Sequence, residues 1–471
     1  MATKGELLIA LFGYLIVVSV IGITALLRTK SVADFTIGGR SLNWFTTALS
    51  THASGMSGWL LLGLPGMIYV SGITSMWILP GLLIGALSAW LFISRRLRVG
   101  SQSYVDDAIT LPQFFIVRTG SARLSMRLVP AFVVMIFYAI YLASGFIAGA
   151  KLVEAVIGWP YLTSLFFGVF IIMIYVALGG FLASSWTDTF QAVLMVSALV
   201  AVVVLAFLQT EQVNVSFEPE VNTASVVSVI SLLSWGLGYL GQPHILARFM
   251  AIKDPDQLPL ARNLGLSWML ICCTAAALIG LFGVDILPDL NDPEKIYIRL
   301  AEMLLNPWIA GCVIAAILAA IMSTVDSQLI VASAAVTQDL GIGRNKGVLA
   351  NRITVIFLSL FAAFIAMDPL SVLDVVAVAW AGLGASFGPS LLACLYWSRT
   401  SDIGIVAAMV VGSVVTLVWD FVAVGIFTQI YEILPAFALS AITLVVVSLL
   451  TPSDIAKARA IGKFTLSDES A

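Results

Sequence analysis

One apolar stretch of this chain carries oxygen-bearing residues at a spacing that would gather them on one face of a helix. Four small or hydroxyl residues follow the i, i+3, i+4, i+7 pattern: Ala320, Ser323, Thr324 and Ser327. Hydroxyls in apolar helices often bond back to the carbonyl four residues earlier, so alone they are weak evidence. Asp326 lies beside them, and a carboxylate within a membrane-crossing helix indicates function. Carbonyl, hydroxyl and carboxylate oxygens together are the ligands that a hard cation such as sodium prefers.

Two further stretches interrupt runs that would otherwise form apolar helices. In Trp235–Arg248, WGLGYLGQPHILAR, three glycines and a proline break the pattern. In Ser50–Gly66, STHASGMSGWLLLGLPG, small residues can unwind and offer backbone carbonyls. Broken helices at comparable places in two halves of a membrane protein indicate a transporter binding site, because freed backbone groups survive in lipid only around a cavity or inside protein. The alternative for the small residues is close packing between helices.

The composition places these stretches in a membrane protein. Of 471 residues, 60% are hydrophobic and 10% are charged, whereas a soluble domain carries about 25% charged residues. The net charge of −3 excludes strong electrostatic attraction to nucleic acid. No nucleophile–base pair, metal cluster or phosphate loop suggests an enzyme. The cysteines lack metal-site spacing and are predicted to be buried, reduced thiols: Cys272, Cys273, Cys312 and Cys394.

Hydrophobic runs of about 20 residues predict helices that cross a bilayer. We expect an all-α polytopic protein with thirteen transmembrane helices, and residues 1–471 as a single transporter domain. The predicted spans are 6–27, 44–64, 67–94, 127–154, 160–180, 188–209, 225–243, 263–284, 306–337, 350–367, 371–397, 403–420 and 431–450.

The positive charges predict the orientation. With the N-terminus outside and an odd number of spans, nineteen of the 23 Lys and Arg residues, Arg40 and Arg248 among them, fall on the inner side. The exceptions are Lys4, Lys151, Lys295 and Arg299. The C-terminus is therefore expected in the cytoplasm.

Other polar residues in the apolar runs are ambiguous. Asp188 could cap a helix that begins near it, or bind an ion, and the sequence does not decide between these roles. Asp374 and Asp420 are predicted to lie near membrane faces. His52 and His244 have no catalytic partner in the sequence, and we expect both to be structural.

Several strings resemble the solute:sodium symporter family, and within it the members that carry proline. They span nearly the whole chain: GGRSL at 38, ASGMSGWLLLGLPG at 53, GGFLASSWTDTFQA at 179, WGLGYLGQPHILARFMA at 235, NPWIA at 306 and AAILAAIMST at 315. The resemblance implies sodium-coupled uptake of proline by alternating access in the bacterial plasma membrane. It also implies a five-plus-five inverted repeat, in which spans 2–6 mirror spans 7–11.

The same resemblance implies the residues of each site. Sodium would be held by Ala53, Met56, Ala320, Ser323 and Thr324. A second cation, present in some members, would use Asp188, Asp326 and Ser327. The substrate would contact Ser57, Gly58, Tyr141, Trp235, Tyr239 and Pro243. Arg40 matches a position near the sodium pathway.

The chain departs from the proline-carrying members at Gly55, where they have an aspartate that is important for sodium coupling. Three explanations are open: weaker sodium affinity, compensation by Asp326, or coupling to H⁺ instead. Compensation is favoured because the remaining oxygens still suit sodium.

The residue types in the second interruption suit the proline substrate that the resemblance implies. Trp235 and Tyr239 are four residues apart and share a helix face, so their rings could enclose a pyrrolidine. Helix N-terminal N–H groups at a break would favour its carboxylate. Pantothenate, a betaine, a sugar or another amino acid are alternative substrates on the same fold. A uniporter or channel is less consistent with buried carboxylates in broken, repeated helices. A sensor module is a third alternative, which we do not favour because we expect no kinase domain in this chain.

Overall fold

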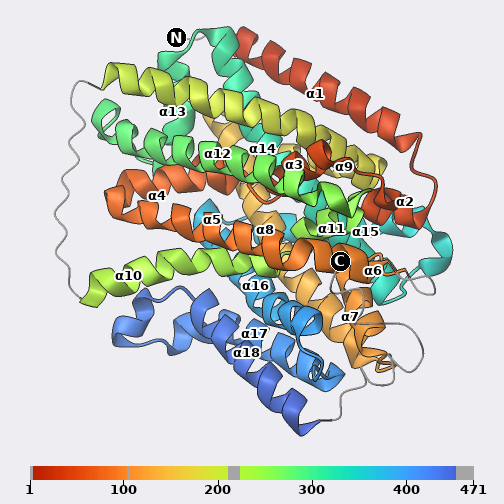
Figure 1. Cartoon of the computed structure of the whole chain (residues 1–471). Coiled ribbons are helices and arrows are strands. Elements are labelled where there is room, and N and C mark those ends of the chain that lie inside the picture. Colours follow the sequence, from red (N-terminus) through yellow and green to blue (C-terminus); the bar gives the residue numbers. More distant parts are fainter. Residues whose placement is uncertain (1–3, 103–106, 211–222, 452–471) are drawn as a thin grey trace.

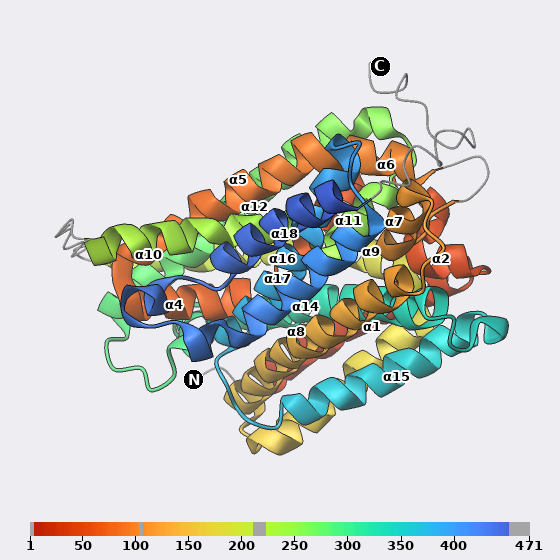
Figure 2. The ribbon, with the colours of Figure 1, turned by 90° about the horizontal axis from the view of Figure 1, so that it is seen from below.

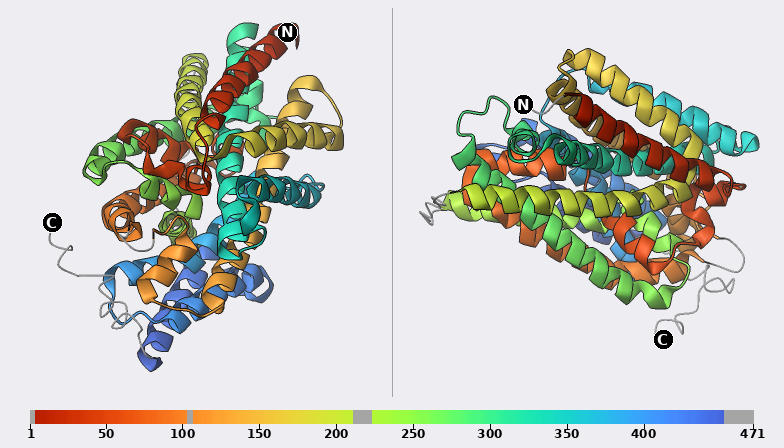
Figure 3. Two further views of the ribbon diagram at one scale, coloured as in Figure 1. Left: turned by 90° about the vertical axis from the view of Figure 1, so that its right-hand side faces the viewer. Right: turned by 90° about the horizontal axis from the view of Figure 1, so that it is seen from above.

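The computed structural model describes residues 4–102, 107–210 and 223–451. Within these ranges the chain is helical, and the β pairing is one isolated parallel bridge between Leu42 and Ile252. The long helices lie side by side in one bundle, with α1 along one edge and α17 and α18 along the opposite edge (Figures 1, 2 and 3). The prediction of an all-α protein is confirmed.

The helices of the first half are α1 (Lys4–Leu26), α2 (Val32–Ile37), α3 (Trp44–Ala53), α4 (Leu64–Ser71), α5 (Ile78–Ser88), α6 (Arg95–Ser101), α7 (Leu111–Thr119), α8 (Ser125–Ile157) and α9 (Tyr161–Gln209). Those of the second half are α10 (Thr223–Ser234), α11 (Pro243–Ala251), α12 (Leu258–Ile286), α13 (Ile296–Leu304), α14 (Pro307–Ala334), α15 (Val348–Ile365), α16 (Val372–Tyr396), α17 (Asp402–Val422) and α18 (Ile433–Leu450). Short 3-10 or π segments join some of them: η1 (Gly38–Arg40), η2 (Trp59–Gly63), η5 (Trp235–Leu240) and η8 (Ala335–Asp339).

Ten helical segments of the described chain are long and apolar enough to cross a membrane. The predicted spans 44–64, 160–180 and 225–243 fall where the structure breaks or kinks a helix. The number thirteen therefore stays a prediction. So does the orientation, and three of the positive residues that support it, Lys457, Arg459 and Lys463, lie outside the described residues.

The predicted separation of spans 160–180 and 188–209 is present as a kink, but the second part begins at the kink and not near residue 188. Helix α9 continues through both, with a kink at Gly180, whose φ of 73° lies in the left-handed region. A side chain at Gly180 would also meet the ring of Phe35. Asp188 consequently lies inside the second half of α9 and does not begin a helix, so its helix-capping alternative is excluded.

Both predicted breaks are present, and the two broken helices run in opposite directions. The first passes from α3 through the non-helical Ser54–Ser57 turn to η2 and α4, and the second passes from α10 through η5 to α11. Helices α4 and α10 lie at the same side of the bundle in Figure 1. At the other end the Leu42 N–H donates to Ala251 O at 3.2 Å, and Lys253 N–H donates to Leu42 O at 2.8 Å. This pairing ties the start of one broken helix to the end of the other.

Glycines in the second break permit close packing. A Cβ on Gly236 would collide with the backbone of Gly81 and Gly85 in α5, and a Cβ on Gly238 would collide with the Trp380 indole. Gly241 likewise lies against the backbone of α16. Close packing, raised as the alternative for the small residues of the first break, thus applies to these three glycines and also to Gly58 of the first break, whose Cβ would meet that of Ala148.

The cysteine prediction holds for three of the four residues. Cys272, Cys273 and Cys394 are buried, free thiols, whereas Cys312 is exposed. The prediction of a buried Cys312 is wrong, because an apolar residue near the start of a membrane helix can face outward at no cost in lipid. Among the described residues, no His, Cys, Asp and Glu group has the arrangement of a metal site.

Candidate ion and substrate site

The stripe on α14 faces the first break, as its periodicity predicts. Ser323 Oγ donates to the carbonyl of Ala53 at 3.0 Å and is also 2.9 Å from the Ala320 carbonyl. Thr324 Oγ1 lies 3.4 Å from the same Ala320 carbonyl, and Met56 N–H donates to Ala53 O at 3.3 Å. The five residues predicted for sodium are therefore linked and buried. Their oxygens carry no formal charge.

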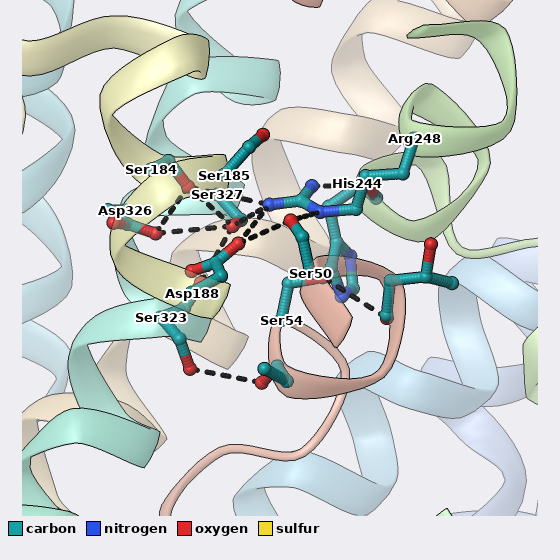
Figure 4. Close-up of polar contacts among 12 residues, drawn as sticks. Ser50, Ser54, Ser184, Ser185, Asp188, His244, Arg248, Ser323, Asp326 and Ser327 are labelled. Atoms are coloured by element: carbon teal, nitrogen blue, oxygen red, sulfur yellow. Dashed lines mark hydrogen bonds and ion pairs between the residues drawn. The ribbon is translucent and has the colours of Figure 1, made fainter. Parts of the chain in front are cut away.

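A charged cluster adjoins this group (Figure 4). Arg248 of α11 is fully buried, and its guanidinium forms an ion pair with Asp188 of α9 at 2.9 Å. Its Nε donates to Ser50 Oγ at 2.7 Å, and its Nη1 donates to the His244 carbonyl at 2.7 Å. Ser50 Oγ in turn donates to Asp188 at 2.6 Å. The cluster thus joins α3, α9 and α11.

Asp326 joins the same cluster through hydroxyls. Ser184 Oγ donates to Asp326 at 2.9 Å, and Ser327 Oγ lies 3.1 Å from both Asp326 and Ser184. Ser327 also accepts a hydrogen bond from Arg248 and lies 2.7 Å from the Ser323 carbonyl. The three residues predicted for a second cation are therefore together, and the guanidinium of Arg248 bonds to two of them, Asp188 and Ser327 (Figure 4).

Sequence reasoning missed Arg248, Ser50 and Ser184. The charge pattern places Arg248 only among the inner positive charges, and that interpretation is incomplete because its side chain is wholly enclosed. A signal was available: two carboxylates in apolar helices require a counter-charge, and Arg248 is the arginine inside the apolar string HILARFMA.

The predicted substrate residues fall into two groups. Tyr141 and Gly58 face the middle of the bundle, where the Tyr141 ring lies 6.2 Å from that of His244 and Gly58 packs on Ala148. Trp235 and Tyr239 contact other aromatic rings: Trp235 stacks on Tyr431 at 4.6 Å, and Tyr239 meets Trp380 edge-on at 4.9 Å. The Trp380 Nε1–H donates to the Trp235 carbonyl at 2.8 Å.

The buried hydroxyl of Tyr239 has no hydrogen-bond partner among the described residues, whereas that of Tyr141 lies near the side chains of Ser57 and Trp59. Buried hydroxyls normally find a partner, so the Tyr239 hydroxyl is available to a ligand. Ser57 is buried next to this region, in the turn of the first break. Pro243 instead lines a cavity between α7, α11 and α14 that reaches Asp339 and Thr110.

The first turn of α11 does not offer the free N–H groups expected of a helix start. Pro243 has no N–H, and the His244 N–H donates to Tyr138 Oη at 2.8 Å. His52 accepts a hydrogen bond from Trp90 at 3.1 Å. Both histidines therefore have the contacts of structural residues.

Arg40 holds the end of the second broken helix. It adopts a left-handed φ of 53° and is buried, and its guanidinium donates to the carbonyls of Met250, Ser101 and Ala108. It also pairs with Asp107 at 2.9 Å. A cation at the C-terminal carbonyls of α11 satisfies groups that the helix leaves open.

The comparisons with known proteins agree on one family. The sequence model of the Sodium:solute symporter family matches residues 35–412. The osmoregulated proline transporter OpuE of Bacillus subtilis is 41% identical, with 95% of each chain covered. The sodium/proline symporter of Escherichia coli is 40% identical, covering 96% of this chain and 94% of its own.

Solved structures show the same fold. A Na⁺-coupled sialic acid symporter in a substrate-bound outward-open state superposes with a TM-score of 0.75 at 15% identity, over 95% of this chain and 98% of its own. A nucleobase-cation-symport-1 family transporter gives a TM-score of 0.58 at 13% identity, over 90% of this chain and 97% of its own. The predicted inverted-repeat transporter fold is confirmed. The chain belongs to the sodium:solute symporter family, whose members are transporters and not enzymes.

Proposed function

We propose that this protein takes up proline together with sodium across the bacterial plasma membrane by alternating access. The observation that carries the proposal is the identity of about 40% with proline carriers over nearly the whole chain. The broken helices and the polar link between Ser323 and Ala53 support it. In this proposal residues 1–471 act as one transport domain, with the N-terminus outside.

Sodium would bind between the first break and α14, at Ala53, Met56, Ala320, Ser323 and Thr324. The hydrogen bond from Ser323 to Ala53 supports this site. A cation there would replace the hydrogen bond and be coordinated by the two oxygens that form it. Bound sodium would then fix α3 against α14 and organise the substrate pocket. One charge moving down a 100 mV potential supplies about 2.3 kcal/mol, equivalent to roughly 50-fold accumulation.

Proline would bind among Ser57, Gly58, Tyr141, Trp235, Tyr239 and Pro243. The partnerless hydroxyl of Tyr239 supports this pocket, because it could bond a polar group of a zwitterion. The aromatic rings would cover the pyrrolidine. The carboxylate of proline would lie nearer to the first break than to α11, because the His244 N–H already donates to the Tyr138 hydroxyl.

The test is uptake of labelled proline into proteoliposomes under an inward sodium gradient, compared with matched proton and potassium gradients. Accumulation that requires sodium supports the proposal. Proton-driven uptake would support the alternative that Gly55 changed the coupling ion. Sodium-driven uptake of pantothenate or a betaine, without proline uptake, would reassign the substrate and leave the fold intact.

A further inference from the structure

We propose that Tyr14 of α1 is a positioning residue for sodium binding. Its hydroxyl fixes the rotation of α14, the helix that presents Ser323 to the first break. Helix α1 lies outside the inverted repeat of spans 2–11, so this role would bring a peripheral helix into the machinery that responds to sodium. The role assigned to Tyr14 rests on the proposed sodium site and adds a residue that is not itself a sodium ligand.

Tyr14 is an unusual residue for the face of α1 on which it lies. Helix α1 packs along α9 and α14 at the edge of the bundle (Figures 1 and 3), and most of its residues are exposed or half-buried. The buried side chains form one stripe: Leu7, Tyr14, Val18 and Ala25. That stripe is apolar apart from the Tyr14 hydroxyl. Phenylalanine would cover the same surface without a polar group to satisfy, so the hydroxyl indicates a specific contact.

The Tyr14 hydroxyl joins three helices. It donates a hydrogen bond to Met322 Sδ of α14 at 3.6 Å and accepts one from Gln191 Nε2 of α9 at 2.8 Å. All three side chains are buried. Because the hydroxyl accepts from Gln191, its own proton is directed towards Met322. Gln191 therefore orients the contact that Tyr14 makes with α14.

This contact controls which face of α14 turns towards the first break. Successive residues of an α-helix point about 100° apart, so Met322 and Ser323 lie on different faces of α14. Met322 contacts α1, whereas Ser323 donates to the Ala53 carbonyl at 3.0 Å. A rotation of α14 that lengthened one contact would also move the other. Tyr14 thus helps to set how the hydroxyls of α14 face Ala53.

The Tyr14 contact is also one turn from the polar cluster of Figure 4. In α9, Gln191 follows Asp188 by three residues, which places both side chains on one face. In α14, Met322 precedes Asp326 by four residues, with the same result. Tyr14 itself lies near both carboxyl groups. The hydroxyl therefore closes the interface of α9 and α14 beside the residues that would hold ions.

Helix α1 is itself held on both sides of Tyr14, as a helix that positions another must be. A Cβ on Gly311 of α14 would meet the Leu7 backbone at 3.2 Å, so the two helices are in close contact near their starts. Beyond the other end of α1, Arg28 lies over the Trp186 ring of α9, with Cζ 5.2 Å from the ring centroid. These contacts fix α1 against both of the helices that Tyr14 joins.

The experiment measures sodium binding to Tyr14→Phe without proline. Purified full-length protein is heated at increasing sodium chloride, with choline chloride keeping the ionic strength constant, and the unfolding temperature gives the sodium midpoint. Tyr14→Phe keeps the ring and removes the hydroxyl, and its midpoint should be about threefold to tenfold higher than that of wild type. Groups that bond a metal ligand directly typically contribute about 10- to 100-fold, and Tyr14 acts one step further away.

Tyr161→Phe is the matched control. Tyr161 Oη also donates to a residue outside its own helix, the Ala366 carbonyl at 2.7 Å, but it lies at the start of α9. Tyr161→Phe should lower the unfolding temperature in choline chloride and keep the sodium midpoint of wild type.

Two further variants test the path through α14. Met322→Leu removes the sulfur acceptor with little change in volume and should raise the sodium midpoint as Tyr14→Phe does. The double variant should bind sodium no more weakly than Tyr14→Phe, since both substitutions remove the same hydrogen bond. Gln191→Leu should act in the same direction. In proteoliposomes, the sodium concentration for half-maximal uptake should rise by the same factor, while KM for proline at saturating sodium stays close to that of wild type.

A Tyr14→Phe variant that unfolds at a lower temperature but keeps the sodium midpoint of wild type would overturn the inference, because the hydroxyl would then serve stability alone. So would an unchanged midpoint in Met322→Leu. Wild type whose unfolding temperature does not respond to sodium would refute the proposed sodium coupling and this role together. Wild type that binds sodium but moves no proline would refute the proposed substrate and leave the role of Tyr14 standing.

Discussion

The two broken helices are built from similar small residues, yet the structure uses them differently. At the first break, Ala53 offers its carbonyl to α14, and a side chain at Gly55 would meet only the flexible end of Ile245. At the second break, Gly236 and Gly238 are pressed against the backbone of α5 and the Trp380 ring. The first interruption frees oxygens and also packs Gly58 closely on Ala148, whereas the glycines of the second serve the close approach of helices.

This difference shows that a glycine-rich interruption has no single meaning. Small residues lower helix stability, which allows unwinding, and they also remove the bulk that separates backbones. Which effect matters depends on what lies opposite. At the first break the partner is a stripe of hydroxyls, whereas at the second it is another backbone.

The largest effect is expected from filling the second break. Gly236→Ala would place a methyl group against the backbone of Gly81, which cannot move aside as a side-chain end can. We expect loss of folded protein, or a fall in proline uptake by roughly 100-fold, from overpacking of more than about 3 kcal/mol. Uptake is measured per molecule of purified transporter. Gly149→Ala is the control, since nothing lies within 4 Å of its Cβ position. Equal effects of the two variants would contradict the packing role.

A smaller effect is expected at the oxygens of the first break. Ser323→Ala removes the hydroxyl that links α14 to Ala53, and the sodium concentration for half-maximal uptake should rise by roughly tenfold. Thr324→Ala should act in the same direction. Proline binding at saturating sodium should change less. Ser333→Ala, whose hydroxyl bonds only to the Ile330 carbonyl of its own helix, serves as the control. Unchanged sodium dependence in Ser323→Ala would reject the sodium site.

A charge added at the first break should have a modest effect. Gly55→Asp brings a carboxylate beside the sodium oxygens, and only Ile245 must shift to admit it. We expect sodium affinity to increase by roughly threefold to tenfold, because opposite charges at close range attract even under partial screening. The measurement is the sodium dependence of thermal unfolding. Gly55→Asn has the same shape without the charge, and an equal gain in that variant would show that charge is not the cause.

The smallest effects are expected from substitutions of two neighbouring serines, Ser184 and Ser185. Ser184 bonds to Asp326 and lies 3.1 Å from Ser327, whereas the Ser185 hydroxyl has no partner among the described residues. Ser184→Ala should reduce the free energy of unfolding by about 1–3 kcal/mol, since it leaves a charged acceptor short of a donor. Ser185→Ala should change it by less than about 0.5 kcal/mol. Thermal unfolding in detergent measures both, and the opposite order would contradict the assigned contacts.

Local patterns predicted much of this molecule. The apolar runs predicted the helices, and the spacing of Ala320, Ser323 and Thr324 predicted one oxygen-lined face, because each depends on residues within a few turns of one helix. Glycine and proline content predicted both breaks. The same information failed at Asp188, where a capping residue and an interior residue of a kinked helix look alike.

Contacts between distant segments could not be predicted in this way. Arg248 meets a carboxylate 60 positions away, and Ser50 meets the same carboxylate across 138 positions. Whether Arg248 faces water or a buried aspartate, and whether Gly236 lines a cavity or touches α5, depends on the packing of helices against each other. The sequence by itself determined the class, the helices and the places where they break, since hydrophobicity and backbone preference act locally. The tertiary structure alone decided which charges meet in the core, because that depends on how segments far apart in the chain pack together.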